Sequence, residues 1–526
     1  MRLVTGSTMA RLDRAAIDEH GIPSLDLMER AGEGIAKSTL EFYPETRRPL
    51  IVCGKGNNGG DGFVVARLLK AYGLTPVVVA LGERDQVSTD ARHNWGRLVS
   101  EAGVSVSVFR PEKGSFQDLL TTVGGNSADL VIDAIFGTGF RGSVCDPYVE
   151  ILQVLNSIKV PHVAVDIPSG VCADDGSVGG VAFRADLTVT MALPKVGQFV
   201  PPGQDYAGVV KVVPIGIPEE ILSEREPGEA ELLEEKQIAE WLPEYARSDH
   251  KGRRGHLLIV TGSPGMTGAG CLAVEAAIVS GVGLATVAVP ASLNPIYEIK
   301  LTESMSLPLP DGGTGRLGPE GWETIRSFLP KADAVVFGPG VGTDPGTARV
   351  LEALVRETQT PILIDADGLN LLAGRPDLLR ERPGPTVLTP HPGEMGRLLG
   401  VSSREIQADR WGFARRLAER TKALVVLKGA GTVITDGNSL WVNPTGNPAM
   451  SQGGMGDVLS GAIGARLAGK MEPTKAAAVG VYLHGLAADE IVKDTGWTVV
   501  RAGEVVEALR DAEERVRLTL RQDPSI

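Results

Sequence analysis

Short apolar runs alternate with helical patterns over the first part of the chain. The runs are rich in valine and isoleucine, and amphipathic segments such as 61–72 and 147–158 lie between several of them. Continuous apolar strands separated by helices are typical of a parallel sheet covered on both faces. The expected strands are 50–53, 76–80, 104–109, 130–136, 162–167, 187–192 and 209–215, preceded by helices near 8–20 and 24–40. The pattern predicts a three-layer α/β/α domain.

The pattern is interrupted between Glu219 and Glu240, a segment with nine glutamates, a Pro227-Gly228 pair and few aromatic residues. Such a composition indicates a solvated linker or an exposed helix. The alternation then restarts, with strands expected at 256–262, 284–289, 334–340, 361–367, 386–394 and 423–429 and two closing helices at 457–468 and 475–491. We therefore expect two α/β domains, residues 1–225 and 236–526.

Composition narrows the class of protein. A net charge of −13 over 526 residues argues against a general nucleic-acid binder or a basic membrane-surface protein. The cysteines at 53, 145, 172 and 271 form no CxxC pair, so a disulfide or zinc framework is not expected. The chain starts with a charged amphipathic helix instead of a signal peptide, and the uncharged stretch 276–297 contains prolines and glycines that disfavour a membrane span. We expect a cytoplasmic protein.

The segment 452–460, QGGMGDVLS, is the most informative motif. Its glycines allow close approach of the backbone to a ligand, and the apolar run from Val458 indicates a helix whose free N–H groups attract anions. Asp457 lies at that helix entry, where a carboxylate can take a proton from an attacking hydroxyl. The alternative is a glycine-rich helix entry with Asp457 as a capping residue.

A second glycine-rich segment, LIVCGKGNNGGDG at 50–62, runs from an apolar strand into a helix. This is the layout of a nucleotide-binding βαβ unit, although the spacing is not GxGxxG. Asn57 and Asn58 add carbonyl oxygens that suit a ligand hydroxyl or a hard cation. Ordinary Asn-Gly turn chemistry remains an alternative for this segment.

Polar residues follow several other strands, at the edge where ligands bind in open parallel sheets. In the first half these are Asp133, Asp166, Ser169 and Lys195, together with the glycine-rich loop 134–142. In the second half the strand ends read TGSPGMTGA, GPGVG, DADGLN, TPHPGEM and KGAGT. The sequence contains no Walker A motif and no Ser-His-Asp arrangement, which excludes a P-loop kinase and a serine hydrolase.

Taken together, GNNGGDG, DAIFGTG, DIPSG, TPHPGE and GGMGDVL in this order resemble the bifunctional NAD(P)H-hydrate repair enzymes, over nearly the whole chain. The resemblance implies a Rossmann-like NAD(P)H-hydrate epimerase domain fused to a ribokinase-like, ADP-dependent NAD(P)H-hydrate dehydratase domain. The first would interconvert the R and S hydrates of NADH and NADPH. The second would dehydrate the S hydrate with ADP, giving AMP and phosphate. Met455 and Met266 depart from the residues common in that family, without removing a charge or a backbone donor.

The resemblance also implies roles for individual residues. The catalytic residues would be Asp166, Lys195 and Asp457. A potassium ion would be bound by Asn58, Asp133 and Ser169. In the epimerase domain, the hydrate would contact Asn57, Asn58, Gly59, Gly60, Asp61, Gly137, Thr138, Gly139, Phe140, Arg141, Gly142, Ser143 and Asp166. In the dehydratase domain, the hydrate would contact Ala269, Gly340, His391 and Asp457, and ADP with magnesium would contact Lys428, Gly429, Ala430, Gly431, Thr432 and Gly456.

Two alternatives remain at this point. The second domain could be a small-molecule kinase that phosphorylates an alcohol, since a GxGD segment is shared across ribokinase-like enzymes. The first domain could be a non-catalytic binding module, although it keeps Asn58, Asp133, Asp166 and Lys195. The expected partners are small-molecule substrates and further copies of the chain, without nucleic acid or membrane. The sequence does not decide between ADP and ATP or between NADH and NADPH.

Overall fold

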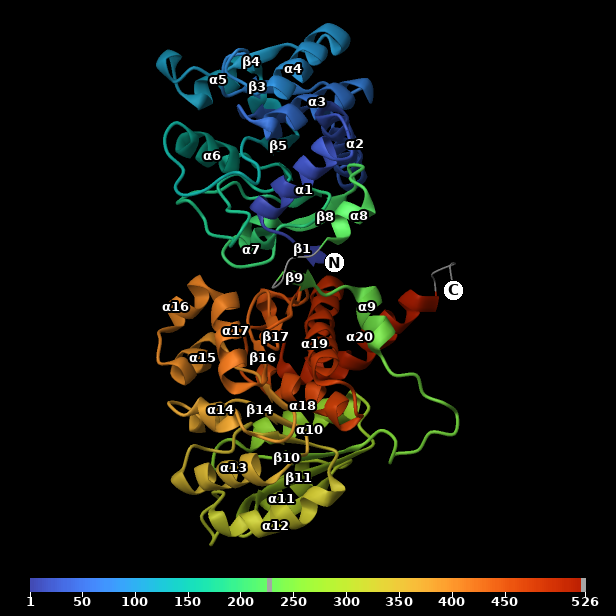
Figure 1. The fold of residues 1–526 in the computed structure, drawn as a ribbon, viewed down its shortest axis with the longest axis vertical. Helices are drawn as coiled ribbons and strands as arrows, with labels where there is room; N and C mark the ends of the chain where they lie inside the picture. The colour runs from blue at the N-terminus through green and yellow to red at the C-terminus, as the bar shows by residue number, and fades with distance from the viewer. Residues whose placement is uncertain (225–228, 522–526) are drawn as a thin grey trace. The chain divides into compact units, whose positions relative to one another are not determined.

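A computed structural model describes residues 1–224 and 229–521 of the chain (Figure 1). The chain divides into two compact units, Met1–Ala230 and Glu231–Ile526, each with its own parallel sheet. Within the described ranges, no helix combines the length and apolar character needed to cross a bilayer. The uncharged stretch 276–297 instead contains a helix end, a strand and a short helix.

Unit 1 has a parallel sheet of order β4-β3-β2-β5-β6-β7-β8. Its strands are β2 (Pro49–Cys53), β3 (Val77–Ala80), β4 (Val106–Val108), β5 (Leu130–Ala134), β6 (His162–Val165), β7 (Leu187–Met191) and β8 (Val209–Val213). The sheet grows outward in both directions from the neighbouring pair β2 and β5. Doubly wound sheets bind ligands where the strand order reverses in this way, so the ends of β2 and β5 are the expected place for a site.

Helices cover both faces of this sheet, as the apolar runs predicted. Alternate strand residues such as Ile51 pack with α2, α3 and α4, whereas Leu50 and Val52 pack with α5 and α6 on the opposite face. The helices of unit 1 are α1 (Gly6–Asp18), α2 (Ser24–Phe42), α3 (Asn57–Ala71), α4 (Thr89–Ala102), α5 (Phe116–Val123), α6 (Tyr148–Ser157), α7 (Gln204–Ala207) and α8 (Glu219–Ser223), and a short strand, β1 (Arg2–Leu3), precedes them. Unit 1 is a three-layer, Rossmann-like domain.

Unit 2 has the strand order β9-β18-β17-β16-β15-β14-β13-β10-β11-β12, parallel from β16 to β12 and antiparallel at β17 and β18. The strands are β9 (Ala230–Leu232), β10 (His256–Val260), β11 (Leu284–Pro290), β12 (Met305–Leu309), β13 (Ala334–Phe337), β14 (Ile362–Ile364), β15 (Thr386–Leu388), β16 (Leu424–Leu427), β17 (Val433–Thr435) and β18 (Leu440–Val442). The sequence pattern missed β9, β12, β17 and β18, because none of them contains four consecutive apolar residues.

The largest core of unit 2 lies between one face of its sheet and a layer of long helices. Ile259 and Val336 of the sheet pack there with residues of α10, α18, α19 and α20. The helices of unit 2 are α9 (Glu235–Trp241), α10 (Thr267–Val279), α11 (Asn294–Lys300), α12 (Trp322–Phe328), α13 (Pro345–Glu357), α14 (Asp367–Leu371), α15 (Pro392–Leu399), α16 (Ser403–Ala408), α17 (Arg410–Thr421), α18 (Met455–Ala468), α19 (Pro473–Thr495) and α20 (Ala502–Arg521). The expectation that two helices close the domain was wrong, since α20 follows them.

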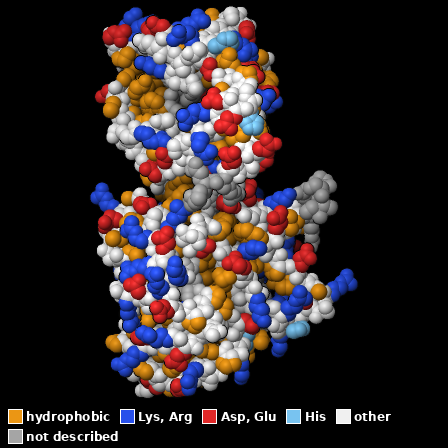
Figure 2. Space-filling view, in the orientation of Figure 1, with side chains coloured by type: hydrophobic (Ala, Val, Ile, Leu, Met, Phe, Trp, Pro, Cys, Tyr) orange, Lys and Arg blue, Asp and Glu red, His pale blue; other side chains and the backbone are white. Residues whose placement is uncertain are grey.

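Two further expectations are corrected. The acidic segment is not a solvated linker, because α8 buries Ile221 and α9 buries Ile238 against the cores of their units; its Pro227-Gly228 pair lies outside the described residues. Helix α3 begins at Asn57 instead of Asp61, so the NNGGDG residues form its first turns and not a loop. Acidic and basic side chains are interspersed over the visible face of each unit (Figure 2).

Candidate active sites

Asp166 has an uncommon backbone conformation for a residue that is not glycine. It follows β6 with a φ of 65°, in the left-handed region. The Gln198 side chain supports this turn by donating from Nε2 to the Asp166 carbonyl oxygen at 2.6 Å. A strained backbone that is held by its surroundings often marks a functional site.

The Asp166 side chain is fixed by a buried cation. Lys195 is completely buried, and its ammonium group forms an ion pair with Asp166 and donates to Thr190 Oγ1 at 3.0 Å and to the Met191 carbonyl oxygen at 2.9 Å. Thr190 Oγ1 in turn donates to Asp166 Oδ1 at 3.0 Å. All three ammonium protons are used, so Lys195 orients the carboxylate and balances its charge.

Asp166 and Lys195 line a cavity of about 150 Å³. Three other predicted residues reach it: Asn57 and Asp61 from α3 and Thr138 from the loop after β5. Two carboxylates that the sequence analysis did not select, Asp13 of α1 and Asp90 of α4, also line the cavity. Four carboxylates and one ammonium group therefore surround this cavity.

Two of these carboxyl groups have raised pKa values. Burial raises the pKa of Asp61 well above its usual range, and the nearby Asp166 and Asp13 add to the effect. Burial raises the pKa of Asp13 to about 6, with Lys195 opposing and Asp166 reinforcing the shift. Carboxyl groups with pKa values near or above neutrality can carry protons under physiological conditions.

The three residues expected to hold potassium lie close together beside the cavity. Asp133 is fully buried; it accepts from Ser169 N at 2.8 Å, from Ser169 Oγ at 2.7 Å and from Ile135 N at 3.1 Å. Asn58 Nδ2 donates to the Phe136 carbonyl oxygen at 3.0 Å, next to the Ser169 hydroxyl. Burial raises the pKa of Asp133 to about 6, although the hydrogen bonds from Ser169 and Ile135 oppose the shift.

The remaining residues predicted for the first site divide into two groups. Gly59 and Gly60 serve packing, since a Cβ at either position would lie within 3.0 Å of Gly54 backbone or the Met28 side chain. Gly137 lies beside Asn58, and the exposed residues Gly139, Arg141, Gly142 and Ser143 continue the loop after β5. In that loop, Arg141 pairs with Asp174 at 2.6 Å and Phe140 stacks on Phe136.

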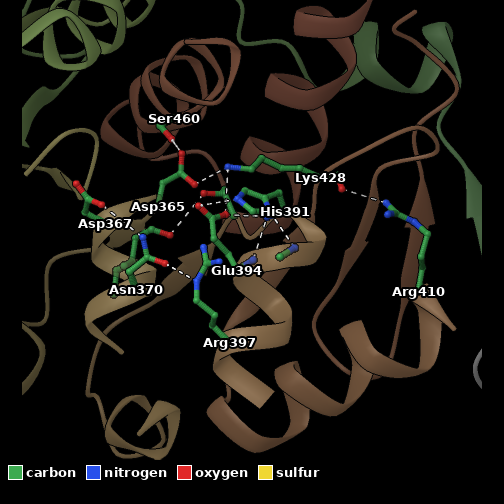
Figure 3. A network of polar contacts seen from close by, with 12 residues as sticks. Asp365, Asp367, Asn370, His391, Glu394, Arg397, Arg410, Lys428 and Ser460 are labelled. Atoms are coloured by element: carbon green, nitrogen blue, oxygen red, sulfur yellow. Dashed lines mark hydrogen bonds and ion pairs between the residues drawn. The ribbon is translucent and has the colours of Figure 1, made fainter. Parts of the chain in front are cut away.

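In unit 2, the ends of β14, β15 and β16 bring a carboxylate–lysine network together (Figure 3). Lys428 Nζ lies 2.6 Å from Asp365 Oδ1 and 3.8 Å from Glu394 Oε2. Ser460 Oγ of α18 donates to Asp365 Oδ2 at 2.7 Å. Although burial alone would lower it, the pKa of Lys428 is raised by Asp365 and Glu394. The ammonium group stays charged at the center of the site.

Asp457 lies in the first turn of α18, next to this network. The N-cap residue is Gly454, with a φ of 92°, and no side chain caps the helix. The alternative that Asp457 serves as the cap was therefore wrong. Burial raises the pKa of Asp457 to about 6, with Asp365 adding to the shift and Lys428 opposing it. A proton acceptor with this pKa beside uncapped helix N–H groups suits proton abstraction next to an anionic ligand.

His391 is both a helix cap and a neighbor of the network. Its Nδ1 accepts from Gly393 N at 3.0 Å and from Glu394 N at 3.3 Å, at the start of α15. Burial lowers its pKa, with Lys428 and Arg397 adding to the effect, so the ring is held neutral. The fixed Nδ1 acceptor leaves Nε2, 3.4 Å from Glu394 Oε1, as the side that can donate.

The loop Lys428–Thr432 follows β16 and turns through Gly429, which has a φ of 135°. Arg410 of α17 stabilises the start of this loop (Figure 3). Its guanidinium group donates to the Leu427 carbonyl oxygen at 3.0 Å and to the Lys428 carbonyl oxygen at 3.3 Å. Gly456 also belongs to this region, since a Cβ there would lie 3.2 Å from Lys428 Nζ. The remaining predicted residues, Ala269 and Gly340, are neighbors, with a Cβ at Gly340 falling 3.1 Å from Ala269 Cβ.

The sequence analysis did not select several residues that the structure brings into these sites. Asp365 and Glu394 lie in strand-end segments that were noted, DADGLN and TPHPGEM, so the strand-end rule could have selected them. Arg410 and Asp13 lie on amphipathic helices without a motif, and nothing in their local sequence distinguishes them from surface charges. Among the described residues, no group of three or more His, Cys, Asp or Glu side chains is arranged to hold a metal ion.

Known proteins match both units. Residues 24–197 match a family model described as YjeF-related protein N-terminus, and residues 257–510 match one described as NAD(P)H-hydrate dehydratase. A bifunctional NAD(P)H-hydrate repair enzyme of Moorella thermoacetica is 41% identical, over 98% of both chains. The corresponding enzyme of Escherichia coli (strain K12) is 36% identical, over 95% of this chain and 92% of the relative. A solved ADP/ATP-dependent NAD(P)H-hydrate dehydratase from Bacillus subtilis is 30% identical over 54% of this chain and 98% of that chain, with a TM-score of 0.49.

The fold and the sites define a two-domain α/β enzyme with a Rossmann-like first unit and a second unit built on a mainly parallel sheet, each with charged side chains gathered at the ends of its parallel strands. The similarity to curated relatives over nearly the whole chain then shows the family. The chain belongs to the bifunctional NAD(P)H-hydrate repair enzymes. Enzymes of this family combine an NAD(P)H-hydrate epimerase domain with an NAD(P)H-hydrate dehydratase domain.

Proposed function

We propose that unit 1 interconverts the R and S hydrates of NADH and NADPH at the Asp166–Lys195 cavity, and that unit 2 dehydrates the S hydrate with ADP at the site around Asp457. The observation that carries the assignment of unit 2 is the position of Asp457. A carboxylate with a pKa near 6 lies at an uncapped helix N-terminus, beside the half-buried Lys428. A proton acceptor and an anion site are thus combined in one place.

In unit 2, the hydroxyl on carbon six of the hydrated ring is a poor leaving group. Asp457 would take the proton of this hydroxyl while the hydroxyl oxygen attacks the terminal phosphorus of ADP, giving AMP and a phosphorylated hydrate. The N–H groups of α18 and the Lys428 ammonium group would stabilise the negative charge that develops. The ring nitrogen would then expel phosphate to give an iminium ion, and loss of a proton from carbon five would restore NAD(P)H.

Magnesium in unit 2 would be held mainly by the nucleotide. The described residues form no three-ligand cluster for a metal, and Asp365 is already paired with Lys428. Magnesium is commonly bound by one or two carboxylates together with substrate phosphates, so Glu394 is the side chain available to it while Asp457 serves as the base. Its chemistry would be to neutralise phosphate charge.

In unit 1, the hydroxyl leaves from a carbon that also bears the ring nitrogen. The nitrogen lone pair can expel it to give an iminium ion, and water can return from the other face. Asp166, oriented and balanced by Lys195, would stabilise the positive ring and take a proton from the incoming water. The loop after β5 and the first turn of α3 would hold the rest of the nucleotide.

Asn58, Asp133 and Ser169 suit a potassium ion, because they present oxygen atoms around a buried carboxylate that forms no ion pair with the described residues. A bound cation would balance the charge of Asp133 and hold the β5 loop against α3. Like the identity of the nucleotide, this assignment is part of our proposal.

The decisive experiment supplies purified protein with a mixture of NADH hydrate epimers and either ADP or ATP. We expect full recovery of NADH absorbance with ADP, and AMP and phosphate in equal amounts. If ADP supports only conversion of the S epimer, the epimerase assignment fails. If a phosphorylated hydrate accumulates without release of phosphate, unit 2 is a small-molecule kinase, the second candidate for this fold. Repeating the assay with sodium in place of potassium tests the cation, whose replacement should slow epimerisation alone.

A further inference from the structure

One acidic side chain of the first cavity has no part in the mechanism above. Asp13 lies on α1, an element outside the sheet, and reaches the same cavity as Asp166 and Lys195. Within the described part of the chain, the carboxyl groups of Asp13 and of the buried Asp61 have no hydrogen bond or ion pair, whereas that of Asp166 has several. Two carboxyl groups that face a cavity without protein partners are free to contact a ligand.

The number of carboxyl groups around the cavity favours a state in which at least one of them is protonated. The titratable groups that line it are Asp13 on α1, Asp61 on α3, Asp90 on α4, Asp166 after β6 and Lys195 before the short 3-10 helix Val196–Gln198. One ammonium group cannot balance all the carboxylates, and Lys195 is committed to Asp166. Buried like charges keep at least one carboxyl group protonated. Burial raises the pKa of Asp61 well above its usual range, while that of Asp13, at about 6, lies where proton exchange near neutrality is possible.

We propose that Asp13 is the second acid–base group of the epimerase site, the one that protonates the departing hydroxyl. The step is balanced. The Asp13 carboxyl proton goes to the carbon-six hydroxyl, the C–O bond breaks with its electron pair on oxygen, and water leaves as the ring nitrogen forms the iminium ion. Water then adds to the other face and gives a proton to Asp166, and proton exchange with solvent resets both groups. No oxidant or reductant is needed.

This inference rests on the proposed epimerase function of unit 1, and the test keeps the two separable. Epimerisation by the full-length enzyme is followed as interconversion of the hydrate epimers without ADP, with the non-enzymatic rate subtracted. Asp13→Asn should lower kcat by roughly 10²–10⁴-fold, the range for loss of a general acid. Asp13→Glu should recover part of it. Asp18→Asn, an exposed position on the same helix, is the matched control and should keep the wild-type rate.

The pH profile distinguishes catalysis from a structural role. In the wild type, kcat/KM for epimerisation should fall as the pH rises above about 6, because Asp13 must be protonated to act. In Asp13→Asn the residual rate should lose this dependence, while dehydration of the S epimer by unit 2 stays at the wild-type rate. A folded Asp13→Asn enzyme with the wild-type rate and pH profile would overturn the inference. If the wild type itself fails to interconvert the epimers, the proposed function of unit 1 fails instead.

Discussion

At the residue scale, burial determines which carboxylates can exchange protons. Asp166 and Asp365 are each tied to a lysine, whereas Asp13 and Asp457 have no such partner and have pKa values near 6. The paired lysine fixes the orientation of Asp166 and of Asp365, whereas burial places the pKa of Asp13 and of Asp457 where proton exchange near neutrality is possible. Carboxylates in differing environments within one site commonly divide acid and base roles in this way.

Asp457→Asn should lower the rate of dehydration far more than it lowers nucleotide affinity. Loss of a general base costs roughly 10²–10⁴-fold in rate, while the N–H groups of α18 that bind phosphate remain. In the wild type, the rate should rise with pH through about 6, since Asp457 acts in its ionised form. Turnover, ADP affinity and melting temperature measured on one preparation decide the matter. A folded variant with near-normal turnover would remove Asp457 from the chemistry.

Asp166→Asn should abolish epimerisation and leave dehydration of the S hydrate unchanged. The substitution removes the charge that stabilises the ring cation and leaves the buried Lys195 without its counterion. Unpairing a buried ion pair typically costs about 3–5 kcal/mol, so unit 1 should also melt earlier. Separate assays of the two epimers check both effects. Wild-type equilibration of the epimers by the variant would contradict the role of Asp166.

At the element scale, a helix supports the loop that we assign to the nucleotide. Arg410 begins α17, is buried, and forms no ion pair with the described carboxylates. Its guanidinium group instead donates to two carbonyl oxygens at the end of β16, and burial lowers its pKa to about 10. An uncompensated buried cation is costly. The hydrogen bonds to these two carbonyl oxygens tie the start of the loop Lys428–Thr432 to α17.

Arg410→Lys should weaken ADP binding while leaving kcat nearly unchanged. Lysine keeps the charge but cannot donate to both carbonyl oxygens in the planar geometry of arginine. Losing one such hydrogen bond, at about 1.4 kcal/mol, corresponds to a KM roughly tenfold higher. Arg416→Lys, at an exposed position of the same helix, is the control. If the KM for ADP is unchanged in Arg410→Lys, or rises equally in Arg410→Lys and in Arg416→Lys, Arg410 does not position the loop.

At the scale of the whole molecule, the boundary between the units determines which fragments can fold. The units meet at Ala230, and β9 and α9 contribute to unit 2. Leu233 is buried in the core of unit 2, and its N–H donates to the Val442 carbonyl oxygen at 3.0 Å. A fragment that begins at residue 236, as the sequence suggested, would lack both interactions.

We expect fragments 1–230 and 231–526 to fold separately, each with its own activity. Fragment 236–526 should be less stable than 231–526 by roughly 2–4 kcal/mol, the cost of a lost buried leucine and one hydrogen bond. Urea unfolding of the two fragments measures the difference. Equal stability would show that β9 and Leu233 do not matter to unit 2. Aggregation of both 1–230 and 231–526 would show that the units do not fold independently.

The sequence by itself determined the two-domain α/β architecture, most of the parallel strands that alternate with helices, and the residues that follow them. Periodicity and glycine-rich motifs are local signals, so Asp133, Asp166, Lys195 and Asp457 could be selected from the chain. Their roles and ligands came from the resemblance of ordered motifs to one family. The short strands β12, β17 and β18 contain no four consecutive apolar residues.

Only the tertiary structure decided which charges meet. The Lys195–Asp166 and Lys428–Asp365 pairs join residues 29 and 63 positions apart, and Asp13 reaches its cavity from a helix that no motif marks. Burial and the distance between charges set a pKa, and neither is a property of local sequence. The sequence therefore determined which chemical groups are present at the strand ends, and folding determined which of them carry a proton.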